Sequence, residues 1–275
     1  VSNHCTNYST SVDDIFIVKY SGFGSFNWAK SLDFSGRARS YGITADANGV
    51  YLTGQLYGST NQFIGLRGTY TGTFTPLTGC VAGTPAISTT CYSSILVSKL
   101  DPLSGNVSWI KTGKSTSCSY TYGADIVVSN GNIYMLAESY GNFEANFGGT
   151  IKTIPEDNII IAKIIDNTST TLTYNWVQGL DLSNTYLDIY TRGSSIYADN
   201  YSNVYVFTGG YIYSGGSLEG YNTPFTSGST PTIQNNLSNG TGGPDIVLAK
   251  YSSSGSRIWS SLIGGFNAEY ARGVT

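Results

Sequence analysis

A unit that recurs four times along the chain constrains its fold more than any other feature of the sequence. The clearest mark of the unit is a short apolar run that ends in a lysine and one further apolar or aromatic residue. Copies of this run span residues 14–20, 94–100, 158–164 and 245–251. Successive repeat lysines are 80, 64 and 87 residues apart, and a fixed order of landmarks at such spacings indicates a repeat architecture.

All four tryptophans share the register of these runs. They follow the repeat lysines by 9, 10, 13 and 9 residues, at Trp28, Trp109, Trp176 and Trp259. A Gly-x-x-x-Trp pattern marks the turn in three copies, at Gly24, Gly105 and Gly255. The third copy has Leu172 at that place, inside a longer polar insertion. A tryptophan at one place in every repeat is expected to pack between units, with a carbohydrate platform as the alternative.

A second hairpin is predicted in the unit. A glycine opens a β-rich run in each copy, at Gly42, Gly123, Gly193 and Gly273. In three copies a polar turn and a run rich in β-branched and aromatic residues follow, the turns being residues 47–49, 129–132 and 200–203. Such turns predict hairpins because Asn and Gly accept positive φ. One unit is therefore four strands, which we call the glycine, aromatic, lysine and tryptophan strands.

The predicted fold class is all-β, a β-propeller of four-stranded antiparallel blades. We find no long stretch with helical periodicity, and repeated four-stranded units are typical of propellers. We expect a single domain over residues 1–275, with a partial first repeat at 1–36, repeats from about 37, 119 and 189, and a next repeat from about 270. The sequence starts in the second half of a unit. It is therefore either a segment of a larger propeller, or the N- and C-terminal strands share one blade.

These runs resemble a known repeat. Residues 14–20 and 41–54 are similar to the bacterial-type β-propeller repeat known as SBBP, with its Tyr-Gly-Ile hairpin and its Asp-Ala-Phe-Val-Ala-Lys-Leu strand. The likeness covers most strands of all four copies, best in the first and fourth, and not the long loops. It implies a propeller in secreted or surface-attached proteins and implies no shared catalytic residues.

Composition indicates an extracellular location. Only 11% of residues are charged, whereas the chain has 22 Tyr and 34 Gly, and hydroxyl and amide side chains dominate its polar residues. A net charge of -3 without a basic stripe argues against nucleic-acid binding. The sequence has no apolar run of about 18 residues, so we expect no membrane span. Val1 is not an initiator residue, which fits a removed signal peptide or a truncated sequence.

The cysteines are expected to form disulfides, as in secreted chains, with free buried thiols as the alternative. Cys80 and Cys91 flank a small loop in the longest insertion, which predicts one bridge and leaves Cys5 with Cys118. Ten intervening residues are not a zinc spacing, and the lone His4 adds no second ligand type, so no metal site is expected.

Glycosylation is a hypothesis at six Asn-x-Ser/Thr sites. They are Asn7, Asn106, Asn167, Asn200, Asn236 and Asn239. About five such motifs would arise by chance in this composition, so the motif alone is weak. Asn236 and Asn239 are the best candidates because they lie in a loop rich in Gly, Ser and Asn.

Catalysis and cofactors are not expected. A single histidine near the N-terminus excludes an ordinary Ser-His-Asp triad in the repeat core, and no carboxylate pair is marked by spacing. The Asp and Asn of the hairpin turns are expected to serve turn formation, with calcium binding as the alternative. The repeat lysines are expected to end a strand and reach solvent, with a ring around the axis as the alternative.

Long insertions fall at one place in the unit, between the aromatic and lysine strands. They are residues 55–92, 138–156 and 210–243, and the loop between Cys80 and Cys91 in the first is expected to lack periodic structure. Insertions at one position of a repeat gather on one face, which is often the binding face. Few of their residues are charged, so we expect them to contact like subunits or glycans rather than to move protons.

The function expected from these features is that of a non-catalytic extracellular structural or assembly protein, a subunit of a cell-surface appendage, filament or layer. One alternative is a glycan- or protein-binding adhesion module. The other is a secreted carbohydrate-active enzyme with carboxylates brought together only in space. The choice among these classes depends on composition and analogy.

Overall fold

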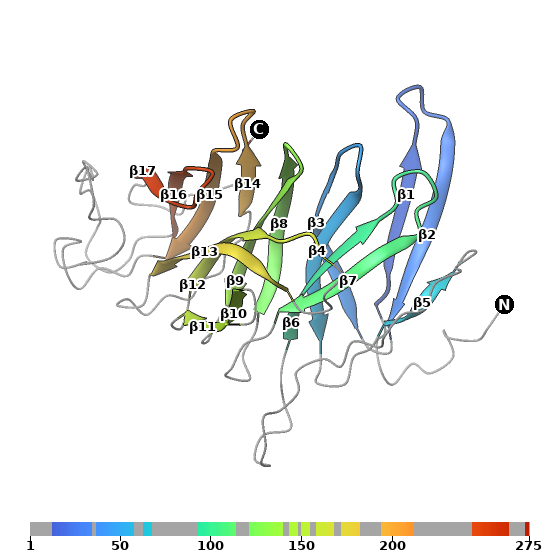
Figure 1. Cartoon of the computed structure of the whole chain (residues 1–275), viewed down its shortest axis with the longest axis horizontal. Coiled ribbons are helices and arrows are strands. Elements are labelled where there is room, and N and C mark those ends of the chain that lie inside the picture. Colours follow the sequence, from blue (N-terminus) through green and yellow to red (C-terminus); the bar gives the residue numbers. More distant parts are fainter. Residues whose placement is uncertain are drawn as a thin grey trace, which may run out of the picture.

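The computed structural model of the protein describes most of the repeat strands and the turns between them. The described residues are 13–34, 37–57, 63–67, 93–113, 121–139, 143–147, 150–154, 158–167, 172–181, 194–211, 244–263 and 273–274. Within these ranges the chain is all-β, with 17 strands and no helix, as predicted (Figure 1).

The strands follow the predicted order along the chain. They are β1 (Ile15–Tyr20), β2 (Phe26–Phe34), β3 (Ala38–Ala45), β4 (Val50–Tyr57), β5 (Phe63–Arg67), β6 (Ser93–Leu100), β7 (Val107–Gly113), β8 (Thr121–Ser129), β9 (Asn132–Ser139), β10 (Phe143–Phe147), β11 (Thr150–Ile154), β12 (Asn158–Ile164), β13 (Tyr174–Asp181), β14 (Ser195–Ala198), β15 (Val204–Tyr211), β16 (Pro244–Tyr251) and β17 (Arg257–Ile263).

Three four-stranded antiparallel sheets form the body of the molecule. Their strand orders are β3-β4-β6-β7, β8-β9-β12-β13 and β14-β15-β16-β17. We call them units 2, 3 and 4, and β1 with β2 unit 1. Each complete unit contains the glycine, aromatic, lysine and tryptophan strands in that order, which confirms the predicted four-stranded units. Figure 1 shows the units side by side in chain order, with β1 and β2 at one end of the row and β16 and β17 at the other.

The lysine strands explain why the units stack. Strands β6 and β12 are apolar on both faces and are buried almost throughout. Such a strand is stable only between two other layers. Three apolar clusters fill the three spaces between successive units, and each draws residues from both of its neighbours.

The glycine strands approach their neighbours closely. Strand β8 packs against β3 and β4 of unit 2, and β14 packs against β8. A Cβ atom at Gly42 would lie 2.8 Å from the Cα of Asp125, and one at Gly123 would lie 1.8 Å from the Oγ1 of Thr53. These glycines therefore permit the backbone contact between units.

The turns use the Asx chemistry that was expected from the sequence. The Asp46 carboxylate accepts hydrogen bonds from the amides of Asn48 and Gly49, and Asp199 accepts them from Tyr201 and Asn203. These bonds give the turn carboxylates a structural role. Across the described ranges no group of three or more His, Cys, Asp or Glu side chains is placed to hold a metal ion.

Two insertions contain strands that the sequence analysis missed. Strand β5 lies within residues 55–92 and pairs antiparallel with β2 of unit 1, whereas the loop between Cys80 and Cys91 lies outside the described residues. Strands β10 and β11 form a hairpin inside the second insertion, and β10 contacts β13. Residues 212–243 of the third insertion lie outside the described residues, whereas residues 210–211 belong to the end of β15.

Candidate functional site

The face that each unit turns toward the next unit carries a row of three side chains. The aromatic strand contributes a tyrosine, the lysine strand the repeat lysine and the tryptophan strand the tryptophan, each directly opposite the next across the sheet. The rows are Tyr51–Lys99–Trp109, Tyr134–Lys163–Trp176 and Tyr205–Lys250–Trp259, with Lys19–Trp28 in unit 1. The ladder shifts register directly after each lysine, so the row has the same geometry in all four units.

The repeat lysines lie against the rings of the row. The Nζ atoms of Lys99, Lys163 and Lys250 are 5.5, 5.9 and 4.8 Å from the ring centroids of the tyrosines opposite them. Such contacts stabilise the charged ammonium. Lys19 donates to the carbonyl of Pro102 at 2.5 Å, and Lys99 pairs with Asp166 at 2.6 Å. These two lysines therefore bind the following unit, rather than reaching free solvent as expected.

The tryptophans make the same connection between units. In units 1–3 the indole N–H donates to the turn that joins the lysine and tryptophan strands of the following unit. Trp28 bonds the carbonyl of Pro102 at 3.3 Å, and Trp176 bonds the carbonyl of Ser253 at 3.0 Å. Trp109 bonds the Asp166 carboxylate at 2.7 Å. All three side chains are buried, which fits packing between units better than a carbohydrate platform.

A glycine in the receiving turn makes room for the indole. Gly105 and Gly255 have φ values of +70° and +84°, which favour glycine. A Cβ atom at Gly105 would lie 2.7 Å from the ring of Trp28, and one at Gly255 would lie 2.6 Å from the ring of Trp176. The Gly-x-x-x-Trp pattern therefore contains a residue for each half of the contact. Its glycine makes room for the tryptophan of the preceding unit, and its tryptophan is the residue that packs on a following unit.

Unit 3, whose sequence departs from the Gly-x-x-x-Trp pattern, receives the tryptophan of unit 2 differently. Asp166 replaces the backbone carbonyl as acceptor, and it accepts from both Trp109 and Lys99. The buried Lys111 donates to the carbonyl of Ile165 and to Asn167 of the same turn. Burial lowers the pKa of Lys111 to about 8. Leu172 is buried against unit 2, where its amide bonds the carbonyl of Thr112.

Among the described residues, the same contact is open at both ends of the row of units. Trp259 is half-buried, whereas the other three tryptophans are buried. At the opposite end, Phe16 and Tyr20 of β1 are 69% and 59% exposed. Their counterparts in unit 4, Val247 and Tyr251, are 7% and 3% exposed, and Tyr251 packs in the apolar cluster between units 3 and 4.

A buried carboxyl group links units 3 and 4. Glu138 of β9 accepts hydrogen bonds from Tyr122 and, at 3.0 Å, from Ser194. Ser194 also bonds Thr208 at 2.8 Å. Burial raises the pKa of Glu138 to about 8 despite these donors. Gln55 has the corresponding place in unit 2, where it accepts from Tyr41, so the site suits a neutral side chain.

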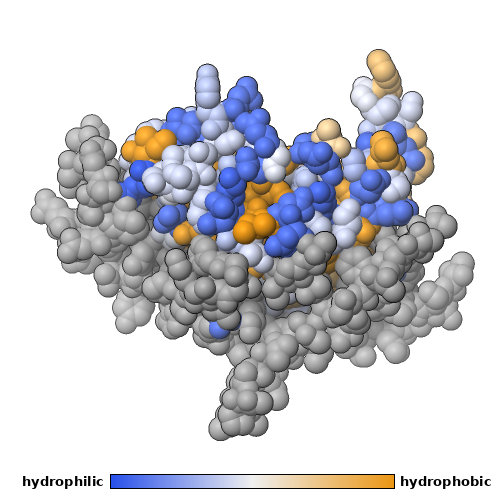
Figure 2. All heavy atoms as spheres, viewed as in Figure 1, coloured by the Kyte–Doolittle hydropathy of each residue, from blue (hydrophilic) through white to orange (hydrophobic). Residues whose placement is uncertain are grey.

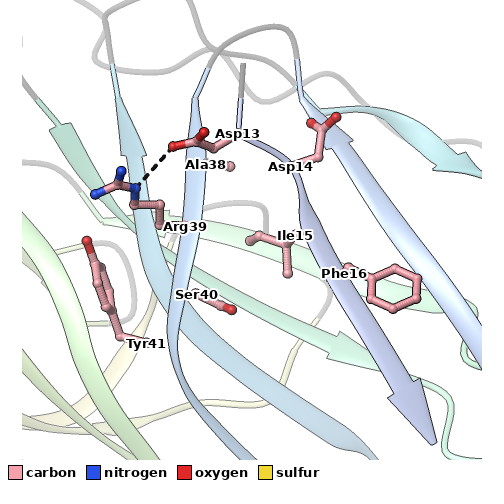
Figure 3. A pocket seen from close by; sticks show the side chains of 8 residues that line it. All are labelled: Asp13, Asp14, Ile15, Phe16, Ala38, Arg39, Ser40 and Tyr41. Carbon is pink, nitrogen blue, oxygen red and sulfur yellow. Dashed lines mark hydrogen bonds and ion pairs between the residues drawn. The ribbon is translucent and has the colours of Figure 1, made fainter. Parts of the chain in front are cut away.

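A hollow lies beside the free edge of β1. It is lined by residues 13–16 at the start of β1 and by residues 38–41 of β3, and Figure 3 shows Arg39 reaching toward Asp13. The Asp13 carboxylate pairs with Arg39 at 3.1 Å and with Arg37 at 2.5 Å. In units 2–4 the aromatic strand pairs with this edge of the lysine strand, whereas β1 pairs only with β2 among the described strands. The hollow therefore corresponds to the place of an aromatic strand in a complete unit.

The other predicted site residues are only partly described. Cys5, Cys80, Cys91 and Cys118 lie outside the described residues, as do Asn7, Asn236 and Asn239. Asn200 lies at an exposed turn, where a sugar could be attached, whereas Asn106 and Asn167 are half-buried. The disulfide pairing and the use of the sequons remain predictions.

Hydrophobic side chains are also exposed at the tips of the hairpins. Phe23, Leu103 and Tyr201 are 100%, 85% and 85% exposed. They lie in the turns β1–β2, β6–β7 and β14–β15. Figure 2 shows hydrophobic residues of the described surface in separate groups among hydrophilic ones.

Comparison with known proteins adds no relative. No protein-family model matches the chain, and no curated protein is significantly similar to it. The resemblance to the SBBP repeat therefore stays a prediction. The described residues include no helix long and apolar enough to cross a membrane.

Proposed function

We propose that this chain is a non-catalytic structural protein of the cell exterior, built on β-propeller blades, that assembles with like subunits into an appendage, filament or surface layer. The observation that carries the proposal is the recurrent contact between units. Every unit has a tryptophan on one face, and each following unit supplies a turn that accepts the indole N–H. A unit with two such complementary faces is suited to stacking in a line.

The propeller part of the proposal is supported by how the units pack. Successive four-stranded meanders are stacked face to face, and their glycine strands lie next to one another, as in neighbouring blades. The similarity of the lysine and aromatic runs to the SBBP repeat supports the same reading. The low charge and the many hydroxyl side chains are compatible with an extracellular protein.

Assembly is tested on the purified chain. Sedimentation velocity over a concentration series, followed by negative-stain electron microscopy, should show oligomers or filaments that grow with concentration. A chain that stays monomeric at every concentration, or one that cleaves a polysaccharide, would contradict the proposal.

Adhesion is the second candidate, favoured by the exposed side chains at the hairpin tips. Phe23, Leu103 and Tyr201 offer apolar surface of the kind that packs against sugar rings or protein partners. A glycan array is the direct test. Binding that is lost in Tyr201→Ala and Phe23→Ser, with the oligomeric state unchanged, would favour adhesion over assembly.

A further inference from the structure

The contact between units occurs three times within the chain, and its two halves are also present, separated, at the ends of the row. One half is a tryptophan face and the other is a turn with a glycine at positive φ. Comparing the open halves with the closed contacts shows what each of them lacks.

The tryptophan face of unit 4 is complete. Trp259 lies opposite Lys250, as in every unit, and its ring contacts Tyr205 with centroids 6.3 Å apart. Lys250 lies 4.8 Å from the ring centroid of Tyr205. Within the described ranges no receiving turn covers Trp259, which explains why it is more exposed than its three counterparts.

The turn of unit 1 matches a closed receiving turn bond for bond. The Ser21 amide donates to the Ser25 carbonyl at 2.8 Å, and the Gly24 amide donates to the Ser21 carbonyl at 2.9 Å. The corresponding distances in the closed turn 252–256 of unit 4 are 2.8 and 2.9 Å. Gly24 has a φ of +79°, close to the +84° of Gly255.

What the turn of unit 1 lacks is its tryptophan. A Cβ atom at Gly24 would meet nothing within 4 Å, whereas one at Gly255 would strike the ring of Trp176. The Gly22 carbonyl has the place of the Ser253 carbonyl that accepts the Trp176 indole, because each is the third residue after its repeat lysine. Phe16 and Tyr20 beside this turn are exposed where their counterparts in unit 4 are covered.

We propose that the Tyr205–Lys250–Trp259 face of one copy of this chain docks on the turn 21–25 of a second copy, so that the contact between units continues from copy to copy. Trp259 packs on Gly24 and donates to the Gly22 carbonyl. The side chains of the Tyr205–Lys250–Trp259 face cover Tyr20. The partner is a second copy because the two halves lie at opposite ends of the same row of units (Figure 1).

Such a contact is heterologous, since each copy contributes its tryptophan face to one neighbour and its turn 21–25 to another. Heterologous contacts generate closed rings or open filaments. The inference rests on the proposed function, since it assumes that like subunits assemble, and it adds which surfaces meet.

The test uses two variants that each remove one half. Trp259→Ala removes the indole from the tryptophan face of unit 4, and Gly24→Ala puts a methyl group where that indole would pack. Each should weaken self-association at least about tenfold by sedimentation velocity. The matched controls are Ile258→Ala, on the opposite face of β17, and Gly131→Ala, which carries the same positive-φ strain with nothing within 4 Å. Both controls should associate within about twofold of the unchanged chain.

Mixing the two variants is the decisive step. The Trp259→Ala copy keeps its turn and the Gly24→Ala copy keeps its tryptophan, so together they should form one contact and stop at a dimer. If both variants assemble as the unchanged chain does, or if the mixture forms no capped dimer, the inference is overturned while the proposed function stands. If the unchanged chain is itself monomeric, both are overturned.

Discussion

Glu138 is a buried carboxyl group whose protonation is coupled to folding. Its side chain is 1% exposed, and burial raises its pKa to about 8, whereas a glutamate in an unfolded chain has a pKa of about 4.3. Between these values the folded state holds a proton that the unfolded state has released. The free energy of unfolding therefore falls as pH rises through this window.

Replacing this carboxyl group should remove that pH dependence. We expect Glu138→Gln to raise the free energy of unfolding at pH 8–9 by on the order of a few kcal/mol, and to change it little at pH 4. Urea unfolding across the pH range measures both effects. The reverse change in unit 2, Gln55→Glu, should make stability fall more steeply with pH. A Glu138→Gln variant with an unaltered pH profile would show that the carboxyl group titrates normally.

Gly255 of the receiving turn is constrained both by its positive φ and by the neighbouring Trp176 ring. Gly255→Ala should cost about 2–4 kcal/mol, because its methyl group would lie 2.6 Å from the Trp176 ring and its φ is +84°. Gly131→Ala, at a φ of +71° with open space around it, should cost only about 1–2 kcal/mol. Chemical denaturation compares the two. Equal losses would mean that backbone strain, and not the tryptophan, explains the glycine.

At the scale of strands and turns, the contact between units 2 and 3 depends on one carboxylate. Asp166 accepts from the Trp109 indole at 2.7 Å and pairs with Lys99 at 2.6 Å. In the contacts between units 1 and 2 and between units 3 and 4, a backbone carbonyl accepts the indole N–H instead. The contact is therefore conserved in geometry while its acceptor changes.

Removing the acceptor should separate its two roles. We expect Asp166→Ala to lower the free energy of unfolding by about 1–3 kcal/mol, because the indole N–H is left without its partner. Asp166→Asn keeps an oxygen for the indole and loses only the partly exposed ion pair, so it should cost about 0–1 kcal/mol. Unfolding in low and high salt checks this, since only the ion pair is screened. Equal costs for the two variants would mean that the indole bond contributes nothing.

The strands themselves could be predicted because each unit repeats its signals. Glycine, Asx turn, lysine and tryptophan recur in order, and the structure has the four-stranded antiparallel units that follow from them. Strand β5 was missed because five residues show no clear period, and its partner β2 belongs to the preceding unit. The hairpin β10–β11 had a usable signal, since two glycines separate two β-rich runs at residues 143–147 and 150–154.

The contact surface was harder to predict than the strands. The shared register of the tryptophans predicted that they lie at equivalent places between units. The receiving turn could not be found this way, because the acceptor for Trp28 lies 74 residues further along the chain. Periodicity within a strand reports which side chains share a face, but not which backbone that face meets.

For the whole molecule, we propose that the two ends of the row of units are complementary. The most direct measurement places the photo-crosslinking residue p-benzoylphenylalanine at Tyr20, on the exposed face of β1. The counterpart of Tyr20 in unit 4, Tyr251, packs in the cluster that holds Tyr134 and Trp176. Mixing isotopically heavy and light copies distinguishes crosslinks between copies from those within one copy.

The proposed docking predicts crosslinks between copies from position 20 to peptides that contain Tyr205 or Trp259, and their loss in the Trp259→Ala variant. Assemblies whose crosslinks from position 20 reach other peptides, or that form with none between copies, would contradict it.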